Sequence, residues 1–289
     1  MGVDPREVRA LAARFGLRLT KARGQHFLTD PRWIRAIVDC AEVTPEDGVL
    51  EIGPGLGVLT APLAERAGRV VAVEIDARLI DALGVLFSDR PNVTIVHADF
   101  LALDLPSLLA AYFPPGMPLK VVANLPYYIT SPILFRLLEG GVEFRSITVM
   151  VQKEVAERLV ARPGTKAYGM LTASVARYAT PRRCFDVPAG AFFPPPRVAS
   201  TVVHLAPYAS PRYADCADGY AMLVAVSFQS RRKTLANNLR QAFPTFDVDW
   251  GAWLSAHGFD PRVRGEALSP DDFCRLGAAL FALVGGASR

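Results

Sequence analysis

The sequence predicts an α/β protein whose mainly parallel sheet carries helices on both faces, followed by a small, mainly helical C-terminal domain. Short runs rich in Val and Ile alternate with helix-like segments between residues 49 and 160, which is the pattern of a parallel sheet covered on both sides. Of the 289 residues, 51% are hydrophobic and 21% charged, so the chain can bury a full core. After residue 207 the pattern becomes helical throughout.

The expected elements follow in chain order. A basic arm, residues 1–35, contains a short amphipathic helix at 5–15, and Asp30-Pro31 marks the next helix start because Pro is favoured in a first turn. The expected strands are Val49–Ile52, Arg69–Val73, Asn92–Val96, Leu119–Ala123 and Ile147–Val151. The helices expected between and after them are Val58–Ala67, Ala77–Phe87, Ser131–Glu139, with Ser131 as N-cap, and Lys153–Val160.

A change of character near residue 207 suggests two domains. Two late apolar runs, Arg183–Val187 and Ser200–Leu205, can add antiparallel edge strands around a Pro-rich loop. Residues 208–211 are typical of a linker, and turn breakers at Gly258 and Pro261 divide the helical pattern that follows. We therefore expect one domain at 1–207 and a helical one at 208–289.

Composition and charge exclude several classes of protein. No run approaches the roughly 18 apolar residues of a membrane span, and five charged side chains in the first 15 residues argue against a signal peptide. The cysteines are far apart, without a C-x-x-C pair, so we expect neither a zinc site nor a disulfide framework, and a reducing cytoplasmic location. They are Cys40, Cys184, Cys216 and Cys274.

The net charge of +4 is concentrated at the N-terminus, where residues 1–35 carry eight Lys or Arg against three acidic residues. A basic arm before a slightly acidic body fits a polyanionic partner. A solvated helix face is the alternative interpretation of the same charges.

Glycines gather where the first expected strand meets the first helix, in residues 51–57, Glu-Ile-Gly-Pro-Gly-Leu-Gly. Glycine lets a backbone approach a ligand closely, and open α/β sheets bind ligands beyond the carboxyl ends of their strands. A dinucleotide site would need glycine at Val58 or Thr60. The observed spacing is similar to the glycine motif of class I S-adenosylmethionine-dependent methyltransferases, with a purely structural turn as the alternative.

Two acidic residues end the next two expected strands. Glu74 can accept hydrogen bonds from ribose hydroxyls, although this alone does not separate the two cofactor classes. The methyltransferase resemblance implies that Asp99 accepts from an adenine amine. A solvated acid is the alternative at either position. Together with Gly53 and Gly55, the two acids are candidate cofactor-binding residues.

The fourth expected strand ends in Asn124-Leu125-Pro126-Tyr127. The N6 amine of adenine is a poor nucleophile because its lone pair is delocalised, and acceptors aimed at its hydrogens oppose that delocalisation. The Asn124 side chain and the Leu125 carbonyl can be those acceptors, Pro126 can fix the carbonyl's direction, and Tyr127 can stack on an extruded base. Such positioning requires neither a nucleophilic side chain nor a metal. An ordinary Asn-Pro turn is the alternative.

From about Lys21 to the C-terminus, the sequence resembles the ribosomal RNA adenine N6,N6-dimethyltransferases, most closely their bacterial small-subunit members. Besides the glycine and Asn124–Tyr127 segments, the landmarks are Gly24–Leu28, Val151–Val155, Lys166–Gly169, Ala191–Val198 and Phe228–Thr234. The resemblance implies a Rossmann-like class I methyltransferase fold and S-adenosyl-L-methionine as cofactor. It further implies a cofactor pocket lined by His26, Leu28, Gly53, Glu74, Asp99 and Asn124, and places Phe192 near the target base.

Two positions depart from the family pattern. His26 stands where the family usually has Asn, so its imidazole either contacts cofactor or packs the N-terminal arm. Arg197 replaces a common Lys and keeps the positive charge.

By the same resemblance, the substrate is two adjacent adenines in the 3′-terminal hairpin loop of 16S rRNA, dimethylated in a pre-ribosomal 30S particle by a cytoplasmic monomer. The residues expected to contact RNA are Lys153, Arg158, Arg197, Arg231, Arg232 and Lys233. The last three cannot form one stripe on a helix, so solvation or packing between the domains is the alternative. Alternative functions are a large-subunit rRNA adenine methyltransferase and a non-catalytic ribosome-assembly or transcription factor.

Overall fold

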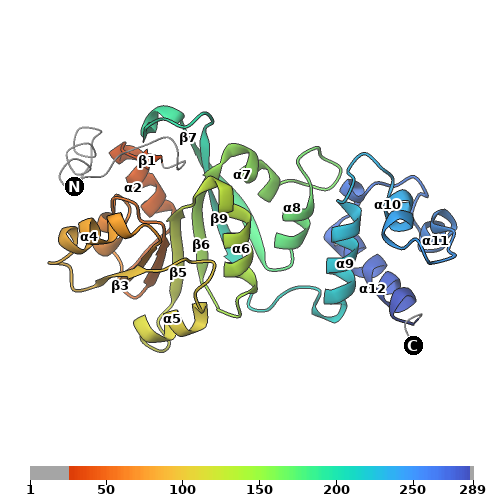
Figure 1. Cartoon of the computed structure of the whole chain (residues 1–289), viewed down its shortest axis with the longest axis horizontal. Coiled ribbons are helices and arrows are strands. Elements are labelled where there is room, and N and C mark those ends of the chain that lie inside the picture. Colours follow the sequence, from red (N-terminus) through yellow and green to blue (C-terminus); the bar gives the residue numbers. More distant parts are fainter. Residues whose placement is uncertain (1–25, 287–289) are drawn as a thin grey trace. The chain divides into compact units, whose positions relative to one another are not determined.

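The computed structural model describes residues 26–286, so the helix expected at 5–15 and most of the basic arm lie outside the described residues. Two compact units are present (Figure 1). The first comprises the described residues up to Ala156 together with Thr180–Pro207, and the second comprises Glu157–Ala179 and the chain from Tyr208 onward. The second unit thus includes a segment that precedes residue 207, and a functional division at that residue stays a prediction.

A seven-stranded sheet organises the first unit, in the order β4-β3-β2-β5-β6-β9-β7. The first five strands in that order are parallel, and β9 pairs antiparallel with β6. The bounds are β2 (Gly48–Ile52), β3 (Arg69–Glu74), β4 (Val93–His97), β5 (Leu119–Asn124), β6 (Ser146–Gln152), β7 (Ala179–Val187) and β9 (Ser200–Pro207). The predicted α/β fold and both late strands are confirmed, and β2 lies at the point where strand order reverses.

Helices connect the strands and shield the sheet. They are α2 (Pro31–Cys40), α3 (Thr60–Ala64), α4 (Ala77–Leu86), α5 (Leu105–Tyr112), α6 (Thr130–Glu139) and α7 (Lys153–Leu159). Residues of α2 and α3, such as Ile37 and Leu63, bury against strand residues that include Val70 and Val122. Figure 1 shows α6 across the face of the sheet turned to the viewer. Helix α5 is not among the helices expected from the sequence.

Two helix starts test the capping predictions. Asp30 caps α2 as expected, because its side chain accepts a hydrogen bond from the backbone N–H of Arg32 at 3.0 Å. The expectation that Ser131 caps α6 is wrong. A 3₁₀ turn, η2 (Tyr127–Ile129), leads directly into the helix, which therefore begins at Thr130 with Ile129 in the cap position.

A separate two-stranded sheet joins distant parts of the first unit. Strand β1 (Phe27–Leu28) pairs antiparallel with β8 (Phe192–Phe193), and the N–H of Thr29 donates to the carbonyl of Ala191 at 2.9 Å. Neither strand is apparent from sequence, since each has only two residues. The pairing holds the chain before α2 against the Pro-rich loop.

Helices form most of the second unit, which confirms the predicted helical C-terminal region. They are α8 (Met170–Val175), α9 (Ala217–Ser227), α10 (Leu235–Ala242), α11 (Trp250–Ala256) and α12 (Pro270–Gly286). Their core includes the fully buried Trp250 and Phe273. The hydroxyl of Tyr220 in α9 donates to the carbonyl of Ala173 in α8 at 2.7 Å. Between residues 26 and 286, no helix is both long enough and apolar enough to cross a bilayer.

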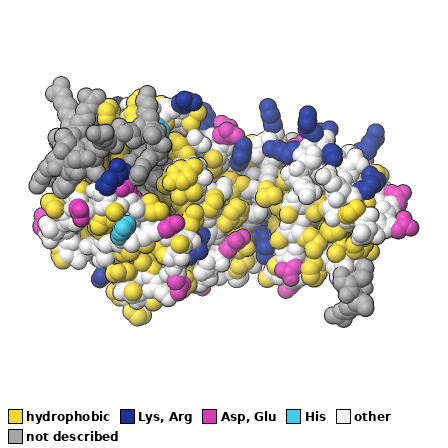
Figure 2. Space-filling view, viewed as in Figure 1, with side chains coloured by type: hydrophobic (Ala, Val, Ile, Leu, Met, Phe, Trp, Pro, Cys, Tyr) yellow, Lys and Arg dark blue, Asp and Glu magenta, His cyan; other side chains and the backbone are white. Residues whose placement is uncertain are grey.

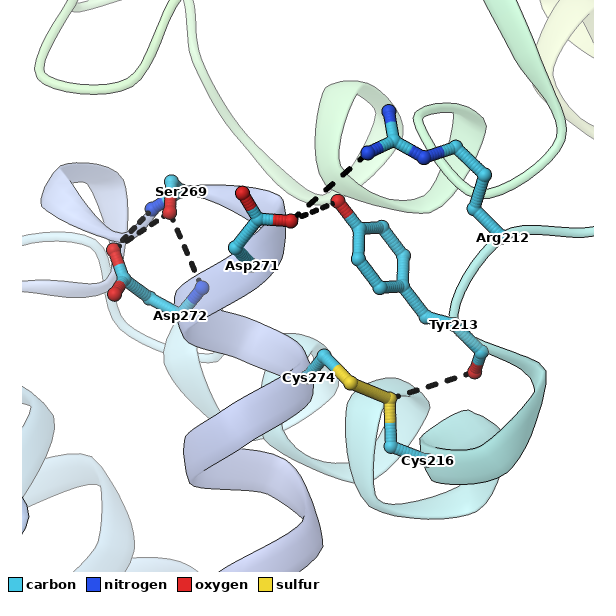
Figure 3. The surroundings of a disulfide bond; sticks show 7 residues. All are labelled: Arg212, Tyr213, Cys216, Ser269, Asp271, Asp272 and Cys274. Atoms are coloured by element: carbon cyan, nitrogen blue, oxygen red, sulfur yellow. Dashed lines mark hydrogen bonds and ion pairs between the residues drawn. A yellow bond between two sulfur atoms is a disulfide. The ribbon is translucent and has the colours of Figure 1, made fainter.

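A disulfide joins Cys216 to Cys274, a link that the expectation of no disulfide framework did not foresee (Figure 3). The two residues are 58 apart in sequence, but their Cα atoms lie 5.6 Å apart. Helices α9 and α12 cross backbone to backbone at Gly219 and Gly277, where a Cβ on either would collide with the other's carbonyl. That crossing brings the cysteines together, and the inference of a reducing compartment loses its basis.

A buried ion pair lies near the amino ends of β2 and β5, away from the strand ends where the glycine loop lies. The Lys120 Nζ lies 2.9 Å from Asp47 Oδ2, and both side chains are nearly inaccessible. Lys120 also donates to the carbonyls of Ala41 and Glu42, while Asp47 accepts from the N–H and hydroxyl of Thr44. The pair therefore ties β5 to the turn that precedes β2.

Removing one partner should destabilise the protein strongly. Lys120→Met leaves the Asp47 carboxylate buried without a counter-charge, and we expect a loss of about 3–5 kcal/mol in the free energy of unfolding. Urea denaturation measures it. The double variant Lys120→Met/Asp47→Leu removes both charges and should recover most of the loss, whereas a single variant as stable as the wild type would contradict this account.

Candidate active site

A cavity of about 720 Å³ opens at the carboxyl ends of the parallel strands, within the range of small-molecule sites. It brings together ten of the eleven residues predicted for cofactor binding or catalysis. They are His26, Leu28, Gly53, Gly55, Glu74, Asp99, Asn124, Leu125, Pro126 and Tyr127. The glycine loop, Glu74, Asp99 and the segment 124–127 meet because the strands β2 to β5 that carry or precede them are neighbours in one sheet. His26 and Leu28 belong to the segment that pairs with β8 instead.

The glycine loop forms one wall of this cavity. Gly53, Gly55 and Gly57 have φ angles of 68°, 60° and 75°, which only glycine adopts readily. A Cβ on Gly55 would lie 3.3 Å from the Phe27 ring, and one on Gly57 would lie 2.6 Å from the Phe87 ring. Gly57 thus serves packing, whereas Gly53 and Gly55 keep side chains out of the cavity.

Glu74, the last residue of β3, is held by the loops beside it. Its carboxylate accepts hydrogen bonds from the backbone N–H groups of Gly55 at 3.3 Å and of Ile75 and Asp76 at 2.9 Å. Burial raises the pKa of Glu74, while these three donors oppose the shift by favouring the charged form. The carboxylate is therefore fixed in position at the cavity wall.

Asp99 lies two residues beyond the end of β4 and is exposed, unlike Glu74. Its Oδ1 accepts from the backbone N–H of Leu101 at 2.9 Å. The neighbouring Phe100 is buried and also lines the cavity. Asp99 thus presents a carboxylate at the rim, above an apolar surface on which a flat ring can rest.

Asn124 and Tyr127 lie at the end of β5. Asn124 pairs in register with Met150 of β6, and the N–H of Leu125 donates to the Met150 carbonyl at 3.1 Å. The Tyr127 hydroxyl lies 2.7 Å from Ser200 Oγ, and its ring stacks on His26 with centroids 6.0 Å apart. Burial raises the pKa of Tyr127, which keeps the phenol neutral.

His26 is anchored by its own contacts. Its Nδ1 lies 2.8 Å from the carbonyl oxygen of Pro194, and because a carbonyl only accepts, Nδ1 carries the hydrogen. The imidazole thus joins the Pro-rich loop to Tyr127. It lines the cavity, whereas the arm that it would pack in the other interpretation lies outside the described residues.

Phe192 is the one of these eleven residues that does not line the cavity. It is only 4% exposed and packs in the core with residues that include Leu28. Its neighbour Phe193 points the other way, toward Phe27, because side chains alternate along a strand. A contact between Phe192 and a target base stays a prediction.

The six residues predicted to contact RNA differ in their surroundings. Lys153 follows β6 and lies 3.4 Å from Asp186, while Arg158 and Arg197 are exposed. Arg231 donates to the carbonyls of Lys166 and Tyr168 and lies 3.4 Å from Glu266, so it stabilises the second unit.

Arg232 and Lys233 are exposed, and Lys233 donates to the Gln241 side chain. In Figure 2, Lys and Arg side chains gather along the edge of the second unit where α10 lies.

The cavity contains residues that the sequence analysis did not select. Glu51 is buried in its wall, and Tyr128 is 73% exposed at its rim. Glu51 had a sequence signal, since it precedes the glycine loop, whereas nothing in the sequence separates Tyr128 from its neighbours. Within the described part of the chain, no three His, Cys, Asp or Glu side chains come close enough to hold a metal ion.

Comparison with known proteins decides the family. The model of the family described as "Ribosomal RNA adenine dimethylase" matches residues 16–280. The chain belongs to this family. It is 44% identical over 283 residues to ribosomal RNA small subunit methyltransferase A of Shouchella clausii, covering 97% of this chain and 96% of that protein. The Streptococcus pneumoniae (strain P1031) protein of the same name is 45% identical over 276 residues, covering 94% and 95%.

Solved structures of related enzymes share the fold. A dimethyladenosine transferase from Plasmodium falciparum superposes with a TM-score of 0.72 at 26% identity, over 90% of this chain and 98% of that one. The 23S rRNA methyltransferase ErmE gives a TM-score of 0.66 at 30% identity, over 87% and 98%. The predicted methyltransferase fold is thereby confirmed.

Membership of this rRNA methyltransferase family implies S-adenosyl-L-methionine as the methyl donor. The residues present fit that molecule. Glu74 offers a fixed carboxylate for ribose hydroxyls, Asp99 an acceptor for an adenine amine, and Gly53 and Gly55 leave room for the ligand. When bound, the cofactor supplies a methyl group already activated by its sulfonium.

Loss of the Glu74 carboxylate should weaken cofactor binding. Glu74→Ala removes an acceptor for ligand donors and frees three backbone N–H groups, so we expect a loss of about 1–3 kcal/mol, or roughly 5- to 150-fold in Kd. Calorimetric titration with S-adenosylmethionine measures it. Asp81→Ala, which removes an exposed carboxylate from α4, is the matched control and should leave Kd unchanged. If Glu74→Ala binds S-adenosylmethionine with the same Kd as Asp81→Ala, Glu74 does not contact the cofactor.

Proposed function

We propose that this protein dimethylates N6 of two adjacent adenines in the 3′-terminal hairpin loop of small-subunit rRNA, using S-adenosylmethionine. The observation that carries the proposal is the meeting of Asn124–Tyr127 with the glycine loop and Glu74 in one cavity. The family assignment supplies the reaction class, and the relatives named for the small subunit supply the substrate.

Positioning is the chemistry that this chain contributes. Asn124 is fixed because its strand is paired on one side with β6 and the next N–H is bonded to Met150. Its amide oxygen accepts from the target amine, and the Leu125 carbonyl is the second acceptor. Both acceptors favour the pyramidal nitrogen that attacks the methyl group, so their contribution grows toward the transition state.

The target base has to leave its stack to reach the cavity, which costs a few kcal/mol and is least costly in a loop. Tyr127 compensates part of this cost by stacking on the base. Its ring is held by Ser200 and His26, so little conformational freedom is lost when the base arrives. A rigid stacking surface beside Asn124 therefore favours an extruded adenine.

The similarity to ErmE favours a second candidate, methylation of large-subunit rRNA. The identity is 30% with ErmE and 44–45% with the small-subunit relatives, which supports the small-subunit substrate. A non-catalytic assembly or transcription factor on this fold would not need the fixed geometry of Asn124. We further propose a cytoplasmic monomer acting on a pre-ribosomal 30S particle. The location is supported by the bacterial origin of the relatives named for the small subunit, since bacteria assemble their ribosomes in the cytoplasm.

Asn124→Ala should abolish most methyl transfer while leaving the fold intact. Losing one preorganised hydrogen-bond partner of the transition state costs about 2.7–4 kcal/mol, or roughly a hundred- to thousand-fold in rate. Single-turnover transfer of labelled methyl to immature small subunits measures it, with cofactor affinity determined alongside. Naked 16S rRNA, 23S rRNA and a mature, methylated subunit serve as comparison substrates. If Asn124→Ala transfers methyl at the wild-type rate, the segment 124–127 has a structural role only. If the wild-type protein prefers 23S rRNA, the result favours methylation of large-subunit rRNA.

The three adjacent basic residues 231–233 should not all respond alike to substitution. If Arg232 and Lys233 contact phosphates, Arg232→Gln/Lys233→Gln should flatten the log–log dependence of RNA affinity on salt by about 0.7–0.9 per lost contact. Arg231→Gln should instead lower the stability of the protein, because Arg231 donates to internal carbonyls. Filter binding across a salt series, with thermal unfolding, measures both. If the folded double variant shows the same dependence of RNA affinity on salt as the wild type, Arg232 and Lys233 are solvated side chains that do not contact phosphates.

A further inference from the structure

Glu51 is a buried carboxyl group in the wall of the cofactor cavity. It occupies β2 directly before the glycine loop, is 1% exposed, and lines the cavity. Its Oε2 accepts a hydrogen bond from the hydroxyl of Thr60 in α3 at 2.6 Å. Glu74 accepts hydrogen bonds from three backbone N–H groups. Among the described residues, the Glu51 carboxyl group accepts a hydrogen bond only from the Thr60 hydroxyl.

In the described part of the chain, no cation that lines the cavity compensates a charge on Glu51. Within residues 26–286, none of the residues lining the cavity is Lys or Arg. From the elements packed against Glu51, α3 contributes the neutral Thr60, β3 the carboxylate of Glu74, and β5 the neutral amide of Asn124. The other titratable groups around the cavity are Asp76, Asp99, His26, Tyr127 and Tyr128.

Burial without a counter-charge favours the neutral acid, because an ionised carboxylate loses its hydration there. Burial raises the pKa of Glu51 to about 8. The nearby charge of Glu74 adds to this increase in pKa, and the hydrogen bond from Thr60 opposes it. At neutral pH the cofactor-free protein therefore holds a proton on Glu51.

The two ligands of a methyltransferase differ by one charge. S-adenosylmethionine carries a sulfonium, an ammonium and a carboxylate, so its net charge is one positive. S-adenosylhomocysteine, the product of transfer, has lost the sulfonium charge and is neutral overall. A nearby positive charge favours the ionised form of a carboxyl group, so the substrate cofactor opposes protonation of Glu51 more than the product does.

We propose that Glu51 is a proton-coupled counter-charge for the cofactor: it is protonated in the cofactor-free cavity and ionises when S-adenosylmethionine binds. In this step the O–H bond of the carboxyl group breaks, the electron pair stays on the carboxylate, and the proton passes to solvent. The proposal rests on the proposed function, since it requires S-adenosylmethionine in this cavity. Glu51 acts as a positioning and selectivity residue that favours substrate cofactor over product.

The sign of the pH dependence follows from this coupling. Where Glu51 is protonated without ligand and ionised with it, affinity for S-adenosylmethionine rises with pH, by up to about tenfold per pH unit. Above the pKa of the cofactor-free protein the affinity levels off. Affinity for S-adenosylhomocysteine should change less over the same range, so selectivity for the substrate cofactor falls as the solution becomes acidic.

Calorimetric titration of the full chain with each ligand tests the proposal. The titrations are repeated in two buffers that differ in their enthalpy of ionisation, at about pH 6.5. This pH lies below the pKa of a free α-amino group, roughly 7.7–8.0, so the amines of the ligands do not titrate. We expect about one proton released per bound S-adenosylmethionine and clearly fewer per S-adenosylhomocysteine. Equal release with the two ligands would overturn the proposal.

Two variants identify the group that releases the proton. Glu51→Gln keeps a similar side-chain shape but has no titratable proton. The number of protons released when S-adenosylmethionine binds should therefore fall toward zero, and the affinity for S-adenosylmethionine should become independent of pH. Asp99→Asn removes a different cavity carboxylate and should weaken binding without abolishing release. Release that persists in Glu51→Gln refutes the proposal. If Glu51→Gln does not fold, equal proton release with the two ligands in the wild-type protein still overturns the proposal. A wild-type protein that binds neither ligand would instead contradict the proposed function.

Discussion

Parallel pairing of β2 with β3 and β5 is the constraint on which the site depends. Parallel strands end at one edge of the sheet, so the segments that follow them meet there whatever their separation in sequence. The glycine loop, Glu74 and Asn124 are positioned in this way, and strand order reverses beside β2. The polar groups gathered at that edge are therefore available to bind and orient a ligand.

Most of this architecture could be predicted because its signals are local and repeated. The five parallel strands are short runs of Val and Ile, and glycines with positive φ or an acid at a strand end are visible in the sequence itself. The two-residue strands β1 and β8 carry no periodicity, and α5 and α8 are too short or too uniformly apolar to stand out. Ser131 was assigned as a cap by composition, whereas the preceding 3₁₀ turn decides where α6 begins.

Contacts between residues far apart in the sequence cannot be predicted from local sequence patterns. The disulfide depends on Gly219 and Gly277, which let α9 and α12 approach so closely that Cys216 and Cys274 meet one turn before them. A run of basic residues likewise does not say which of them is engaged within the protein. Both Arg231 and Arg232 are exposed, but the Arg231 guanidinium donates to the carbonyls of Lys166 and Tyr168. Phe192 faces the core because the register of β8 decides its direction.

The pairing of β1 with β8 has a consequence for the synthesis of the protein. Phe27 and Leu28 line the cavity from a segment made early, but their partners Phe192 and Phe193 are made late, and the adjoining bond from Thr29 to Ala191 spans 162 residues. The parallel core of the sheet, up to β6, is complete before then. A nascent chain can therefore assemble the parallel core of its sheet on the ribosome that makes it, whereas the β1–β8 pairing beside the cavity forms only after about two thirds of the chain has emerged.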